Sequence, residues 1–172
     1  MLTHQLKDLI KTYPDFPEKG ISFRDLLPVL TNPKIHSELI GAMAADPMFE
    51  KCDAVIAIDA RGFLLGSSIA LKLLKPLIVA RKPRKLPGDL IHKSYNLEYG
   101  SNSLSIQKDS INSYQTFAIV DDLLATGGTV KCVSSMLKSS GKIISGLSVV
   151  IELNEFEAKA NFDFPVKSQV QY

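Results

Sequence analysis

Short apolar runs alternate along the chain with segments in which apolar residues return every three or four positions. Runs without alternation are typical of strands covered on both faces, and helical spacing is typical of amphipathic helices. The pattern predicts buried strands at residues 54–58, 77–80, 117–120 and 143–153, and an alternating strand at 103–107. It predicts helices at residues 2–13, 34–45, 62–74 and 129–141. Strands that alternate with helices indicate an α/β fold with a central parallel sheet flanked by helices.

Three stretches lack this periodicity. Residues 14–33 contain four prolines, so this stretch is predicted to be loop-like, with Asn32 capping the helix that follows. Residues 81–103 combine glycine, proline and charge, and a loop of that length is usually functional or mobile. The tail from Asn154 is less regular than the rest of the chain.

Composition narrows the classes of protein to consider. A chain of 172 residues, 45% hydrophobic and 22% charged, predicts one globular domain spanning residues 1–172. A net charge of +2 gives no electrostatic argument for nucleic acid, and no apolar run approaches the length of a membrane span. The two cysteines lack metal-ligand spacing, and we assign no residue as a metal ligand. We therefore expect a soluble cytoplasmic protein with reduced thiols and no nucleic-acid or membrane partner.

Candidate chemistry follows three of the predicted strands. The segments are "DARG" from Asp59, "RKPRK" from Arg81 and "DDLLATGGT" from Asp121. Ligands of open parallel sheets bind beyond the carboxyl ends of the strands. Taken singly, each segment has a simpler interpretation: a loop ion pair between Asp59 and Arg61, a solvated basic face, and a glycine turn.

The third segment, "DDLLATGGT", indicates a more specific ligand. Glycines between a strand and a helix let backbone N–H groups approach a phosphate, and threonine hydroxyls can add donors. Asp121 and Asp122 would repel a phosphate but can accept hydrogen bonds from sugar hydroxyls. The segment lacks the lysine of a Walker loop and the glycine spacing of a dinucleotide site. A ribose 5-phosphate fits these requirements.

The segment "AIVDDLLATGGT" resembles the phosphoribosyl diphosphate motif of the type I phosphoribosyltransferases. Together with "FPEKGISFRDLLPVL", "DARGF", "RKPRKLPG" and "YNLEYG", it is similar to the adenine-specific branch of that family over nearly the whole chain. The resemblance implies a type I phosphoribosyltransferase fold, with a hood over the base site from about residues 1–32 and the C-terminal tail. It implies a mobile loop at about residues 81–103, a Mg²⁺ cofactor and a homodimer. It also implies the transfer of the 5-phosphoribosyl group from 5-phosphoribosyl 1-diphosphate to adenine, which gives AMP and diphosphate in purine salvage.

The resemblance further implies roles for individual residues. The 5-phosphate is expected at Ala125, Thr126, Gly127, Gly128 and Thr129, and the ribose hydroxyls at Asp121 and Asp122. The diphosphate is expected at Asp59, Ala60, Arg61, Arg81, Lys82, Lys85 and Tyr99. Adenine is expected at Ser22, Phe23 and Arg24. Glu98, beside Tyr99, is the expected proton-transfer group.

Several alternatives stay open at this point. Phe23 is an aromatic in an apolar stretch that could pack in a core, and Glu98 could be a solvated loop charge. Arg84 stands where members of the family often carry glycine, and "GSS" from Gly66 also departs from the family pattern. The competing functions are a regulator with the same fold and a transferase for another base.

Overall fold

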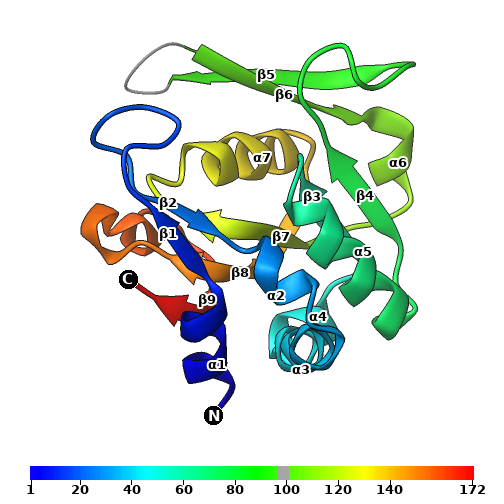
Figure 1. Ribbon diagram of the computed structural model, residues 1–172. Helices are drawn as coiled ribbons and strands as arrows, with labels where there is room; N and C mark the ends of the chain where they lie inside the picture. Colours follow the sequence, from blue (N-terminus) through cyan, green and yellow to red (C-terminus); the bar gives the residue numbers. More distant parts are fainter. Residues whose placement is uncertain (97–100) are drawn as a thin grey trace. The chain divides into compact units, whose positions relative to one another are not determined.

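The computed structural model describes residues 1–96 and 101–172, and it divides the chain into two compact units, Met1–Met43 and Ala44–Tyr172. Figure 1 labels the helices and strands of both units along the chain. The elements that begin in the first unit are α1 (Leu2–Leu9), β1 (Lys11–Tyr13), β2 (Phe23–Asp25), α2 (Leu27–Leu30) and α3 (Pro33–Ala44).

The first unit is more regular than the sequence pattern predicts. Helix α1 ends at Leu9, and the residues predicted to continue it form β1, which pairs antiparallel with β2. The predicted loop-like stretch thus contains a strand and the short helix α2. The two strands form because pairing between residues distant in sequence overrides local propensity. The predicted cap is confirmed: Asn32 Oδ1 accepts a hydrogen bond from the Ile35 N–H at 3.2 Å.

The second unit holds the central sheet. Its helices are α4 (Pro47–Lys51), α5 (Gly62–Leu73), α6 (Lys108–Asn112), α7 (Gly128–Ser139) and the 3₁₀ helices η1 (Asn154–Phe156) and η2 (Ala158–Asn161). Its strands are β3 (Ala54–Ile58), β4 (Leu77–Ala80), β5 (Leu90–Asn96), β6 (Ser101–Gln107), β7 (Thr116–Leu124), β8 (Ile143–Glu152) and β9 (Val166–Gln171). Strands β4, β3, β7, β8 and β9 form one sheet in this order, and every neighbouring pair is parallel. The predicted fold class is therefore confirmed.

The two faces of this sheet carry different helices. Ile56 and Ile58 of β3 belong to the same buried core cluster as Val133 of α7. Helix α5 lies against the other face, because a side chain at Gly66 would bring its Cβ within 2.5 Å of the Ala57 Cβ. Glycine at this position therefore allows α5 to lie close to β3.

Some elements of the second unit were not predicted. Residues 81–103 were expected to be a loop, but they include β5 and part of β6, which form an antiparallel hairpin. Strand β7 extends beyond the predicted residue 120 to Leu124, so Asp121 and Asp122 lie within the strand. The irregular tail contains β9, which completes the sheet next to β8. Within the described parts of the chain, no helix has the length and apolar character needed to cross a membrane.

Candidate active site

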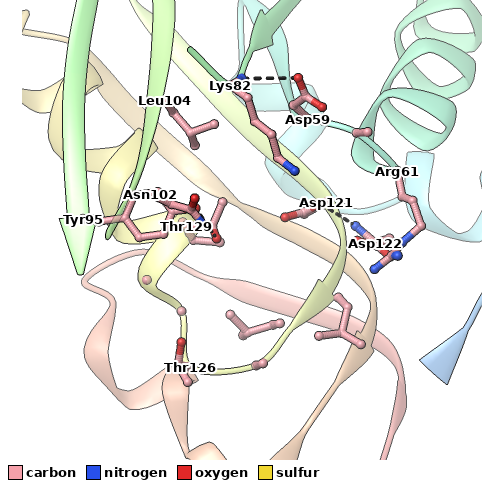
Figure 2. A pocket seen from close by; sticks show the side chains of 17 residues that line it. Asp59, Arg61, Lys82, Tyr95, Asn102, Leu104, Asp121, Asp122, Thr126 and Thr129 are labelled. Carbon is pink, nitrogen blue, oxygen red and sulfur yellow. Dashed lines mark hydrogen bonds and ion pairs between the residues drawn. The ribbon is translucent and has the colours of Figure 1, made fainter. Parts of the chain in front are cut away.

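A cavity of about 390 Å³ lies in the second unit, where the ends of β3 and β7 meet the start of α7 (Figure 2). One side of the cavity is formed by the hairpin of β5 and β6. Its lining residues are Asp59, Ala60, Arg61, Lys82, Tyr95, Asn102, Leu104, Asp121, Asp122, Leu123, Leu124, Ala125, Thr126, Gly127, Gly128, Thr129 and Val130. The cavity therefore brings together residues from all three of the segments that the sequence analysis singled out.

The loop between β7 and α7 has the geometry of a phosphate cradle. Gly127 has a φ of +81°, a left-handed conformation that favours glycine. A side chain here would also meet the Phe162 ring, 3.0 Å from the Cβ. Helix α7 begins at the next residue, and the first N–H groups of a helix have no partner within it. These groups and the helix dipole favour an anion at this end of α7.

Two carboxylates on β7 precede the cradle. Asp121 and Asp122 are both buried, and the Asp122 N–H donates to Asp121 Oδ1 at 2.9 Å. Arg61 Nε forms an ion pair with Asp122 Oδ2. Burial, and then the neighbouring charge of Asp122, raises the pKa of Asp121 well above its ordinary value. Asp121 thus lies in an environment that disfavours its charged form.

Close packing keeps this pair in place. A Cβ on Gly62, at the start of α5, would lie 3.0 Å from both Asp121 Oδ1 and the Val120 carbonyl oxygen. Any side chain at Gly62 would therefore displace the carboxyl group of Asp121 or the helix.

The turn after β3 is bonded to the segment that follows β4. Asp59 Oδ2 accepts hydrogen bonds from Arg81 Nε and from the Lys82 N–H, both at 3.3 Å. The Arg81 guanidinium lies 5.6 Å from the centre of the Phe63 ring. The peptide bond between Asp59 and Ala60 is cis. Both Asp59 and Arg61 thus form ion pairs with residues of other segments. Figure 2 shows the hydrogen bond from Lys82 to Asp59 as a dashed line.

The structure distributes the predicted site residues unevenly. The cavity includes all the predicted phosphate and ribose residues and, of the predicted diphosphate residues, Asp59, Ala60, Arg61 and Lys82. Arg81 and Lys85 are not among its lining residues, and Arg81 donates to the Lys85 carbonyl at 3.4 Å. Glu98 and Tyr99 lie outside the described residues.

The predicted adenine residues belong to the first unit. Phe23 and Arg24 lie in β2, directly after Ser22. The Phe23 ring packs edge-to-face against Phe16, with 5.2 Å between ring centres. Arg24 forms a hydrogen bond with the Thr12 hydroxyl across the strand pair.

Sequence reasoning missed two polar residues of the cavity. Tyr95 and Asn102 are directly paired across the β5–β6 hairpin, so they lie on the same face of it. The alternation at residues 103–107 indicated one strand of this hairpin. Nothing in the sequence indicated its partner strand or the face that meets the cavity.

One departure from the family pattern has a structural counterpart. Arg84 has a φ of +61°, in the left-handed region. A glycine adopts this conformation without steric cost, whereas a side chain does not. The basic segment at residues 81–85 therefore has an arginine in a backbone conformation suited to glycine.

Comparison with known proteins gives consistent matches. Residues 30–160 match the family model described as the phosphoribosyl transferase domain. An adenine phosphoribosyltransferase from Prochlorococcus marinus is 58% identical over 99% of each chain. The crystal structure of an adenine phosphoribosyltransferase from Thermoanaerobacter pseudethanolicus matches with a TM-score of 0.94 and 37% identity, covering 100% of both chains. A Saccharomyces cerevisiae adenine phosphoribosyltransferase, complexed with adenine and an imino-altritol bisphosphate, matches with a TM-score of 0.91 and 32% identity over 98% of each chain.

Proposed function

The chain belongs to the phosphoribosyltransferase family, among its adenine phosphoribosyltransferases, and from this premise we propose how its residues carry out the reaction. The reaction transfers the 5-phosphoribosyl group from 5-phosphoribosyl 1-diphosphate to adenine, giving AMP and diphosphate. One observation carries the assignment of residues. A phosphate cradle directly follows two buried carboxylates in a single cavity, which matches a ligand with a phosphate beside a diol.

The substrate's sugar phosphate is assigned to β7 and the start of α7. The backbone of residues 125–129 would hold the 5-phosphate, with donors from the hydroxyls of Thr126 and Thr129. Asp121 and Asp122 would accept hydrogen bonds from the ribose hydroxyls. In this arrangement the anomeric carbon would lie on the side of the cavity nearer the Asp59–Arg61 turn.

The chemistry at the anomeric carbon suits these charges. The bond from C1′ to the diphosphate oxygen breaks while a bond from C1′ to an adenine ring nitrogen forms, and that nitrogen loses its proton. The sugar becomes cation-like during this step. Positive charge beside Asp121 and Asp122 would favour their charged forms, and the two carboxylates would in turn stabilise the sugar. Arg61, Lys82 and the backbone of the Asp59–Arg61 turn would stabilise the departing diphosphate, with Arg81 and Lys85 adding positive charge to the same loop.

The base is assigned to the first unit. Phe23 would stack on adenine, while the backbone near Ser22 and Arg24 would read its edge. An adenine site must accept from the exocyclic amine and donate to N1. Hypoxanthine reverses that pattern, and the unpaired groups would cost on the order of 10⁴-fold in specificity.

The proton is assigned to Glu98, which lies outside the described residues, as does Tyr99 beside it. A carboxylate can accept the proton that the adenine ring nitrogen loses, and a general base of this kind contributes about 10²- to 10⁴-fold to the rate. Exclusion of water from the site would protect the activated sugar from hydrolysis.

A Mg²⁺ ion fits the donor set of the cavity. The carboxylates that line it are hard oxygen ligands of the kind that Mg²⁺ takes. Asp59 and Asp122 are each paired with an arginine, and among the described residues no three His, Cys, Asp or Glu side chains gather to hold a metal. Asp121 and Asp122 would therefore hold the ion through water, with the remaining ligands coming from the substrate. When bound, it supplies positive charge to the departing diphosphate.

A homodimer is supported by an apolar stripe on α5 and the residues that follow it. Leu64, Leu71 and Leu74 are 44%, 76% and 89% exposed. Leu64 and Leu71 are seven positions apart and so lie on one side of the helix, and Leu74 directly follows its last residue. Exposed apolar surface of this kind is typical of protein interfaces. Loss of the dimer on Leu71→Glu substitution, measured by sedimentation, tests this assignment.

The dimer raises a second question, whether Arg81 serves its own subunit or the partner. Arg81 pairs with Asp59 of its own chain, which supports the first possibility. Mixing Arg81→Ala chains with Asp122→Ala chains separates the two. A site that borrows Arg81 regains activity in mixed dimers, because one of the two sites is then intact. A site complete within one chain does not.

We also propose that the enzyme is cytoplasmic. Both cysteines, Cys52 and Cys132, are buried and free, which is usual where thiols stay reduced.

One assay tests the proposed function as a whole. The protein is mixed with Mg²⁺, 5-phosphoribosyl 1-diphosphate and either adenine, hypoxanthine, guanine, xanthine or orotate, and nucleotide formation is followed by chromatography. AMP formation from adenine alone is the expected result. Equal turnover of adenine and hypoxanthine would contradict the assignment of the base, and no nucleotide from any base would favour a binding protein of the same fold.

A further inference from the structure

Tyr95 contacts the phosphate cradle from the opposite wall of the cavity. Its hydroxyl accepts a hydrogen bond from the Thr129 hydroxyl at 3.3 Å. Its ring lies over Gly128, where a Cβ would come within 3.4 Å of Tyr95 Cδ2. Figure 2 shows the side chains of Tyr95 and Thr129 close together on one side of the cavity. One side chain thus touches two of the five residues assigned to the 5-phosphate.

The hairpin that carries Tyr95 is attached to the helix that follows the cradle. Cys132 Sγ donates to the Lys93 carbonyl at 3.3 Å, and Lys93 Nζ donates to the Ser135 hydroxyl. Lys93 and Tyr95 are two residues apart in β5 and lie on one face of it. Their partners, Thr129, Cys132 and Ser135, follow one another at three-residue steps along α7. The position of Tyr95 is therefore fixed relative to α7 by contacts along one side of that helix.

A packing role alone does not account for the hydroxyl. The Tyr95 ring is partly buried against the core cluster, a contact that phenylalanine would make equally well. The hydroxyl instead reaches a threonine that lines the cavity. Both hydroxyl groups can donate and accept. A phosphate that accepts a hydrogen bond from Thr129 leaves the Tyr95 hydroxyl able to donate to Thr129 in turn, and linked hydrogen bonds of this kind strengthen one another.

We propose that Tyr95 is a positioning residue for the sugar-phosphate end of the substrate, acting through the Thr129 hydroxyl and the Gly128 backbone. This inference rests on the proposed function, which assigns the phosphate to residues 125–129. The inference predicts different effects on the binding of the two substrates. Tyr95 affects the binding of the phosphoribosyl group and leaves the binding of adenine unchanged.

The test measures the binding of ribose 5-phosphate by calorimetry to the full-length protein and to four variants. The variants are Tyr95→Phe, Thr129→Val, the double substitution, and Tyr114→Phe as a matched control. Tyr114 is a half-buried tyrosine of the same unit that is not among the lining residues of the cavity. We expect Tyr95→Phe to weaken binding about 3- to 10-fold, the usual effect of one lost hydrogen bond. In the Thr129→Val background, the same change should have little further effect, because the two hydroxyls act as a unit.

Three further readouts separate positioning from packing. For Tyr95→Phe, the melting temperature and the Michaelis constant for adenine should match those of the unmodified protein, while the Michaelis constant for 5-phosphoribosyl 1-diphosphate rises. Two results would overturn this inference and leave the proposed function intact. One is unchanged ribose 5-phosphate binding by Tyr95→Phe, and the other is an equal loss of affinity when Tyr95→Phe is made in the unmodified protein and in the Thr129→Val protein. A lowered melting temperature with both Michaelis constants raised also overturns it in favour of packing. If the unmodified protein does not bind ribose 5-phosphate, the phosphate assignment of the proposed function fails as well.

Discussion

The two segments assigned to the substrates are built in opposite ways. The cradle at residues 125–129 lies between Leu124 and Val130, which are both buried, and its backbone is fixed by β7 and α7. In the first unit, every residue from Lys11 to Ser22 is exposed, including the Phe16 ring at 52%. A phosphate is recognised by N–H groups that must point in fixed directions, and neighbouring buried elements provide this. The flat aromatic ring of a base is recognised in part by stacking on another ring, whose surface has to be accessible before the base arrives.

The largest expected effect concerns neither segment but the proton transfer assigned to Glu98. Glu98→Gln should lower turnover by about 10²- to 10⁴-fold, because the amide cannot take the proton from adenine. Steady-state kinetics should show little change in the Michaelis constant for 5-phosphoribosyl 1-diphosphate. An unchanged rate would make Glu98 a solvated charge, and a raised Michaelis constant at constant turnover would make it a binding residue.

Two glycines allow the contrast between the segments to be measured directly. Gly127 and Gly20 have similar positive φ values, +81° and +91°, but a Cβ at Gly127 meets Phe162 whereas one at Gly20 meets nothing within 4 Å. Each alanine substitution should cost about 1–2 kcal/mol of backbone strain. Only Gly127→Ala should also weaken ribose 5-phosphate binding, by roughly 10-fold or more, since the cradle must shift.

Calorimetry and thermal unfolding of both variants check this expectation, with Gly20→Ala as the control for strain. Equal losses of ribose 5-phosphate affinity in the two variants would show that general destabilisation, and not the shape of the cradle, is responsible.

The exposed segment offers a smaller effect. Phe16→Leu removes the edge-to-face contact with Phe23 and should raise the Michaelis constant for adenine about 2- to 10-fold, the usual range for one aromatic pair. The melting temperature should hardly change because half of the Phe16 ring is already exposed. Phe16→Tyr keeps the ring and should restore adenine binding. If Phe16→Leu left the adenine constant unchanged, Phe16 would have no part in orienting Phe23.

The smallest effect concerns stability, and it comes from the buried region. Because the pKa of Asp121 is raised in the folded state, folding is disfavoured as the pH rises from the unfolded value of 3.8 through the folded value. Asp121→Asn removes this penalty and should stabilise the fold at pH 7 by about 0.5–2 kcal/mol, the usual size of a stabilising substitution. The advantage should shrink toward pH 3.8 and activity should fall. A melting difference that does not depend on pH would assign the effect to packing instead.

The sequence predicted the inner strands of the sheet more accurately than it predicted β9 or the β5–β6 hairpin. The run at residues 54–58 coincides with β3 because a strand buried on both faces carries continuous apolar residues. The run at residues 77–80 coincides with β4, which lies at the edge of the sheet and has Leu77 exposed. Strand β9 was not predicted because only two of its six residues, "VKSQVQ", are apolar, and the tail around it shows no regular pattern. The predicted strand at residues 103–107 lies within β6, whereas its partner β5 was missed because polar and charged residues dominate it.

The candidate site divides in the same way. The cradle and its two carboxylates form a contiguous motif, so the sequence alone indicated them. The ion pair of Arg61 with Asp122 joins residues 61 positions apart, and the contact of Tyr95 with Thr129 joins residues 34 apart. No local pattern encodes such contacts, because they depend on how the strands are ordered in the sheet.

The ion pairs of the cavity also bear on how binding responds to ionic strength. Arg61 and Arg81 are already paired with Asp122 and Asp59 before any anionic ligand arrives. A ligand that contacts these cations exchanges one anionic partner for another and does not neutralise free charges. Salt screens a difference between two pairings less strongly than it screens one newly formed attraction. Affinity for the diphosphate should therefore fall less steeply with added salt than the charge of the ligand alone would suggest.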